Sequence, residues 1–144
     1  MFVRIGRYAT DKDPEDFERK IKVEVHSFDI WNADHTLALI IHPILIKLKE
    51  TKHGYPPDFC EPKDFRPNPY PETCVGGGWD AYEKILDKMI WSFQEIIDDN
   101  YLMKYYDERP GPEDKTWTHK VMEHDKKIQE GLDLFSKFFR SFWT

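Results

Sequence analysis

The sequence predicts an α+β protein that is mostly helical, with three long helices and a two-stranded antiparallel β element at the N-terminus. Apolar residues recur at helical spacing over two long segments, which indicates amphipathic helices, and a third long segment is apolar nearly all round, which indicates a further helix. Near the N-terminus they alternate with polar residues instead, which is typical of a strand. The chain has 144 residues, of which 40% are hydrophobic, so we expect a single domain over 1–144.

The N-terminal segment 2–28 is predicted to form a β-hairpin. Its two expected strands are 2–8 (FVRIGRY) and 20–28 (KIKVEVHSF), joined by an acidic connection that contains Pro14. In the second strand, apolar side chains on one face (Ile21, Val23, Val25) alternate with polar ones on the other (Lys22, Glu24, His26). A two-stranded sheet is marginal alone, so we expect it to pack on helices.

The first long helix is predicted over 33–52. Asn32 is a favourable N-cap, and Asp34 stands in the first turn, where the helix dipole favours an anion. Gly54 and the prolines that follow it end the helix. Pro43 lies within the helix, and most of the residues around it are apolar.

The remainder of the chain is predicted to contain a proline-rich loop over 54–78 and two helices. A stripe of apolar residues predicts the helix 79–103, and a second stripe predicts the helix 116–141, with a turn over 107–115 between them. Gly131 lies in the middle of the last helix, where glycine is unfavourable by about 1 kcal/mol, so it indicates a close helix contact.

Composition excludes several classes of function. The net charge of −6 argues against general nucleic-acid binding, which needs a basic surface. No apolar run approaches the roughly 20 residues of a membrane span, so we expect no membrane association. The N-terminus lacks a signal-peptide pattern, which favours the cytoplasm and reduced thiols at Cys60 and Cys74.

Polar side chains on the first long helix form the candidate ligand-binding site. On a helical wheel, His35, His42 and His53 fall within about 20° of one another, with Lys49 close by and Asp34 near the start of the helix. Such a row can bind a phosphate or a carboxylate by hydrogen bonds and charge. The alternative is that His35 and His42 are core residues held by protein groups.

Aromatic and basic residues elsewhere complete the predicted ligand site. An exposed tryptophan can stack on a base or contact a partner, and Arg140 could assist in holding an anion. The tryptophans that we expect to take part are Trp31, Trp79 and Trp91.

A metal site is the less favoured interpretation, and we expect no cofactor. His35 and His42 are seven residues apart, about 10.5 Å along a helix axis, which is too far for one metal ion. If a metal were bound, its ligands would be carboxylates, as in helical nucleotide pyrophosphatases. The candidates are Asp34, Glu83, Asp87 and Asp98. The alternative for this acidic face is simple solvation.

Three blocks of the sequence carry a wider pattern. They are WNADHTLALIIHPILIKLKETKHGYP (31–56), Trp79 with ILDKMIWSF (85–93), and IQEGLDLFSKFFRSFW (128–143). The pattern WxxDHTLA, PxLxxLK, KHGxP, LDxMIWxF and GLxLFxK resembles a widespread family of small tailed-bacteriophage proteins of unassigned function. The motif positions in this chain are Trp31, Asp34, His35, Pro43, Lys49, His53, Gly54, Trp91 and Gly131.

This resemblance implies a phage-encoded accessory protein in the cytoplasm of the infected bacterial host. We therefore expect a protein that binds rather than catalyses, sequestering a small anionic nucleotide-type immune signal of the host as an anti-defence sponge. One alternative is a protein–protein inhibitor of a host defence factor, and another is a metal-dependent nucleotide phosphohydrolase. A homo-oligomer with a shared pocket is compatible with the exposed aromatics.

Overall fold

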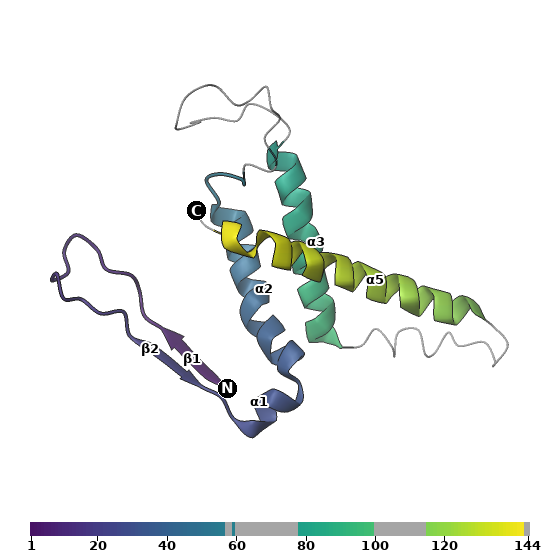
Figure 1. Cartoon of the computed structure of the whole chain (residues 1–144), viewed down its shortest axis with the longest axis horizontal. Coiled ribbons are helices and arrows are strands. Elements are labelled where there is room, and N and C mark those ends of the chain that lie inside the picture. The colour runs from purple at the N-terminus through teal and green to yellow at the C-terminus, as the bar shows by residue number, and fades with distance from the viewer. Residues whose placement is uncertain (57–58, 60–77, 100–114, 143–144) are drawn as a thin grey trace. The chain divides into compact units, whose positions relative to one another are not determined.

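The computed structural model describes residues 1–56, 59, 78–99 and 115–142. Two strands and four α-helices follow one another along the chain, and a short 3₁₀ helix ends the described part (Figure 1). In order they are β1 (Phe2–Ile5), β2 (Ile21–Glu24), α1 (Ser27–Trp31), α2 (Ala33–Thr51), α3 (Gly78–Asp98), α5 (Lys115–Phe138) and η3 (Phe139–Ser141). The predicted fold class is confirmed, since three long helices follow a two-stranded antiparallel sheet.

The three long helices agree with the periodicity of the sequence, and they differ mainly at their ends. The first ends at Thr51, one residue before its predicted end. The second was predicted to continue to 103 but ends at Asp98, because Asp99 has a φ of 44°, a left-handed conformation that ends a helix. The third begins at Lys115 and tightens into η3 at its end. Most of the predicted 54–78 loop and of the 107–115 turn lies outside the described residues.

The N-terminal strands are shorter than predicted, and the extension of the second strand to residue 28 is wrong. Ser27 and Phe28 begin α1 instead. The Asp29 carboxylate accepts a 2.7 Å hydrogen bond from the backbone N–H of His26, and it also lies 2.6 Å from the Met1 ammonium. These contacts hold the pKa of Asp29 below its usual value, chiefly through the ammonium. A short helix start therefore replaces the last predicted residues of the strand.

The described chain divides into two compact units, Met1–Leu37 and Ala38–Thr144, with the boundary inside α2. Each unit is described by itself, and the expected single domain over 1–144 remains a prediction. The first unit contains the hairpin, α1 and the first turn of α2. The second contains the remainder of α2 with α3, α5 and η3.

The second unit has a hydrophobic core that all three long helices build. Its buried residues are Ala38, Leu45 and Leu48 from α2, Tyr82, Leu86, Met89 and Phe93 from α3, and Phe138 from α5. Figure 1 shows α5 crossing α3, and at this crossing Gly131 lies against Ser92, as the mid-helix glycine predicted. Burial of this aliphatic and aromatic surface is the main stabilising term of the unit.

Two ion pairs join α3 to the last turn of α2 and to the residue that follows it. Lys49 Nζ lies 2.5 Å from Asp87 Oδ1, and Lys52 Nζ lies 2.7 Å from Glu83 Oε1. The Lys52 ammonium also donates to the Lys49 carbonyl and lies 5.4 Å from the centre of the Trp79 ring. The Glu83 carboxyl has a lowered pKa, mainly because it accepts the hydrogen bond from Lys52.

Candidate functional site

The predicted histidine row lies partly in each unit. Asp34 is exposed and His35 half-buried at the start of α2, within the first unit. His42 and Lys49 are half-buried further along the helix, within the second unit. His53 is exposed and lies beyond Thr51, so helical spacing does not apply to it. The two parts of the row are therefore described separately.

Several of the predicted ligand residues already have protein partners. Lys49 is paired with Asp87, as described above. The Trp79 ring packs edge-on against Tyr55 at 5.4 Å between ring centroids, and the half-buried Trp91 lies 5.4 Å from the His124 ring. His124 is itself buried, with Nε2 3.0 Å from Glu95 Oε2. Trp79, which is 38% exposed, and Trp91 thus each have a ring contact within the second unit.

The remaining predicted ligand residues stand at the surface. Trp31, at the end of α1, is 90% exposed, and Arg140 in η3 is exposed as well. Trp31 belongs to the first unit and Arg140 to the second, so each is described within its own unit.

The carboxylates proposed as metal ligands are spread along the surface. Asp87 pairs with Lys49 of α2, Glu83 pairs with Lys52 just after α2, and Asp98 accepts a 2.8 Å hydrogen bond from Gln94. Asp34 is exposed on α2, in the other unit. Within residues 1–56, 59, 78–99 and 115–142, no three His, Cys, Asp or Glu side chains are grouped to hold a metal ion. Cys60 and Cys74 lie outside these residues.

The hairpin of the first unit separates apolar from basic side chains. Its register pairs Val3 with Val23 and Ile5 with Ile21, and directly opposed residues of an antiparallel pair share a face. We call these four residues the apolar face, and their exposed fractions range from 36% to 65%. The intervening pair, Arg4 and Lys22, lies on the opposite face.

The first unit lacks a core of its own. All of Met1–Leu37 is described, and none of its residues is buried. Three more large apolar side chains are exposed on α1, namely Phe28, Ile30 and Trp31. Large exposed apolar patches mark interaction sites in proteins, and the four residues of the apolar face are neighbours on one side of the hairpin.

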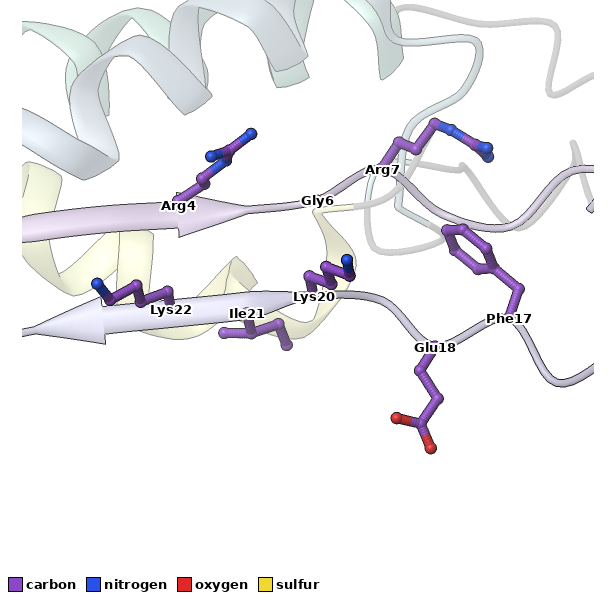
Figure 2. A pocket seen from close by; sticks show the side chains of 8 residues that line it. All are labelled: Arg4, Gly6, Arg7, Phe17, Glu18, Lys20, Ile21 and Lys22. Carbon is purple, nitrogen blue, oxygen red and sulfur yellow. The ribbon is translucent and has the colours of Figure 1, made fainter.

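A cavity of about 430 Å³ opens beside the hairpin and its connecting loop (Figure 2). We call it the hairpin cavity. Its lining residues are Arg4, Gly6, Arg7, Phe17, Glu18, Lys20, Ile21 and Lys22. All of them belong to the first unit, and none was among the predicted ligand residues.

The loop that frames this cavity is held by polar contacts. Both guanidinium Nη atoms of Arg7 donate to the Asp13 carboxylate at 2.6 Å, and Thr10 donates to it through its backbone N–H and its hydroxyl at 2.7 Å. These bonds hold the pKa of Asp13 far below its usual range, with Arg7 as the largest cause. Arg19 Nε donates to the Gly6 carbonyl at 2.7 Å and its guanidinium stacks on Tyr8.

Sequence reasoning missed this cluster, although part of the signal is present. The alternation in KIKVE places Lys20 and Lys22 on one face of the second strand. That Arg4 joins them depends on the register of the two strands, and the contribution of Arg7 depends on how the loop closes. Neither follows from the spacing of residues along the chain.

No protein-family model, curated protein or solved structure matches this chain. None of the helices in the described part is both long and apolar enough to cross a lipid bilayer. Function is therefore inferred from the geometry of the chain itself.

Proposed function

We propose that this chain is a non-catalytic binding protein whose first unit docks on another protein through the apolar face of its hairpin. The observation that carries the proposal is that Met1–Leu37 has no buried residue while Val3, Ile5, Ile21 and Val23 stand exposed together. A two-stranded ribbon gains little stability by itself, so cover over this face would stabilise it.

The expected partner surface is apolar at its centre and acidic at its border. The ribbon is only two strands wide, and its opposite face carries Arg4, Lys20 and Lys22. Carboxylates around an apolar patch would complement these charges and speed association. Trp31 and Phe28 next to the hairpin supply the large aromatic side chains that often dominate binding energy at such interfaces.

The resemblance to small tailed-phage proteins gives this proposal its biological setting. We infer a protein–protein inhibitor of a host defence factor, acting in the cytoplasm of the infected bacterium. A second candidate function is sequestration of a small anionic nucleotide-type signal, and a different observation favours it, namely the basic side chains around the hairpin cavity.

The docking proposal is tested with Val23→Asp and the matched control Leu39→Asp. The two side chains are 53% and 51% exposed, but Val23 belongs to the apolar face and Leu39 to α2 in the second unit. A photo-crosslinking residue at position 23 would first identify the partner in host lysate. The purified partner should then bind wild type and Leu39→Asp equally, and Val23→Asp at least about tenfold more weakly.

Two results would overturn this proposal. One is a purified partner that loses affinity equally with both variants. The other is a homodimer, detected by sedimentation of the chain alone, that Val23→Asp dissociates. That result would assign the apolar face to a second copy of this chain.

A further inference from the structure

The geometry points to the hairpin cavity as a binding site for a small molecule that carries at least two phosphate groups, such as a nucleoside diphosphate. This inference differs from the docking proposal because it rests on the basic side chains of the ribbon, although Ile21 of the apolar face also lines the cavity. If the second candidate function, sequestration of an anionic nucleotide-type signal, is correct, the ligand would bind in this cavity and not along the predicted histidine row of α2.

The first argument is the local concentration of positive charge. Four basic side chains, Arg4, Arg7, Lys20 and Lys22, line a single cavity in a chain whose net charge is −6. Glu18 is the only acidic residue of the lining. Figure 2 shows Glu18 and Ile21 extending to the side of the ribbon opposite Arg4, Lys20 and Lys22. A concentration of charge in a concave site raises the local concentration of anions.

The second argument is that two of the four cations are available for a ligand. Arg7 is held by Asp13, and Lys22 Nζ lies 2.7 Å from Glu24 Oε1. Arg4 and Lys20, by contrast, form no ion pair or side-chain hydrogen bond with any residue in the described ranges. Both are exposed. An entering phosphate would therefore gain charge-assisted hydrogen bonds without breaking existing ones.

The third argument is that the backbone around the cavity is already fixed. The Gly6 N–H donates to the Lys20 carbonyl at 2.8 Å, just beyond the paired strands. A Cβ at position 6 would lie only 3.1 Å from that carbonyl oxygen, so glycine allows this close approach of the two chains. Arg19 Nε donates a second hydrogen bond to the same residue, at the Gly6 carbonyl. A preorganised frame loses little entropy when a ligand binds.

The size and lining of the cavity favour a small phosphorylated molecule. A volume of about 430 Å³ lies within the range of small-molecule pockets. Arginine guanidinium groups match the geometry of phosphate oxygens, and the two available cations, Arg4 and Lys20, suit one phosphate group each. Phe17, whose ring lies 4.9 Å from the Arg7 guanidinium carbon, adds an apolar wall next to the charges.

Titration calorimetry at low salt, with inorganic pyrophosphate and ADP as probes, tests this inference. Arg4→Gln and Lys20→Gln each remove one available cation and should each weaken binding about tenfold. Lys12→Gln is the matched control, because Lys12 is an exposed lysine of the same loop that does not line the cavity. Its affinity should equal that of wild type, and circular dichroism should show all three variants folded.

A second experiment, an NMR titration, locates the bound ligand on the protein independently of its affinity. In a ¹H–¹⁵N titration with pyrophosphate, the amides of Gly6, Phe17 and Lys20 should shift, and Arg4→Gln should suppress these shifts even if calorimetry becomes too weak to fit. The inference is overturned by the absence of heat and shifts with both probes. It is equally overturned if Lys12→Gln weakens binding as much as Arg4→Gln, or if only anionic phospholipid vesicles or single-stranded DNA bind.

Discussion

Ser92 and Gly131 meet so closely where α3 crosses α5 that a Cβ built on Gly131 would lie 2.0 Å from Ser92 Oγ and 2.8 Å from the Lys88 carbonyl oxygen. We expect Gly131→Ala to lower the free energy of unfolding by about 2 kcal/mol, because overpacking a crossing outweighs the roughly 1 kcal/mol that alanine gains in a helix. Urea denaturation of the two proteins measures the difference.

Gly54→Ala is the control for this substitution. A Cβ at Gly54 meets nothing within 4 Å, so stability should change by no more than about 1 kcal/mol. Ser92→Gly removes the nearest obstructing atoms but places a second glycine inside a helix, so it should cost less stability when added to Gly131→Ala than when made in wild type. Equal stability of Gly131→Ala and wild type would contradict the close approach.

Leu86 lies fully buried at the centre of the second unit, among side chains from all three long helices. Leu86→Ala should destabilise the protein by about 3 kcal/mol, through lost burial and the cavity that remains. The same truncation at the exposed Leu39 should change stability by less than about 0.5 kcal/mol. Similar losses at both positions would mean that Leu39 is covered in solution.

Asp13→Asn should loosen the loop between the strands, because it removes the charge that pairs with Arg7 and replaces one of the two carboxylate oxygens, which together accept four hydrogen bonds from Arg7 and Thr10, by an NH2 donor. The Asp13 pKa is lowered in the folded chain, so the order of the loop is complete above about pH 4 and is lost as the pH falls through the folded pKa. Amide exchange at Thr10 reports this change. Asp11→Asn, at an exposed neighbour, should retain the wild-type profile.

Glu83→Gln should flatten the acid side of the stability curve of the second unit. Because the pKa of Glu83 is lowered in the folded protein, its ionised carboxylate adds to the free energy of unfolding above about pH 4.3. This added stability disappears as the pH falls through the folded pKa. The lysine partner has a side chain that is only 5% exposed, so the pair is sheltered more than most surface pairs. Melting temperatures across pH 2–7 test this, with the exposed Glu123→Gln expected to behave like wild type.

The second and third long helices were predictable because each spans several turns, so its apolar stripe repeats often enough to be seen in the sequence. The first was predictable from its long apolar run between Asn32 and Gly54. The helix contact predicted at Gly131 is also confirmed. Glycine in the middle of a helix lowers its stability, so its presence there indicates that a larger side chain would not fit. By contrast, α1 is a single five-residue turn that begins inside an apparently alternating strand. Such a segment has no complete period, and its helical start depends on the Asp29 contacts instead.

The candidate site was less predictable because it depends on contacts between distant residues. A helical wheel places His42 and Lys49 on one side of α2 but gives no information about Asp87, which pairs with Lys49. Likewise, it cannot show that Trp91 packs beside His124. The cationic cluster of the hairpin arises only when Arg4 is brought opposite Lys22.

The hydrogen bonds that join Gly6 to Lys20 and Arg19 fix the register of the two strands at the point where their pairing ends. While these bonds are present, the register does not depend on the length of the chain between Tyr8 and Glu18, so the same side chains share each side of the ribbon. Extra residues inserted near Lys12, such as a short epitope or a dye-attachment tag, should leave both sides of the ribbon in place. This turn is therefore a suitable position for a reporter that follows the protein while it is bound.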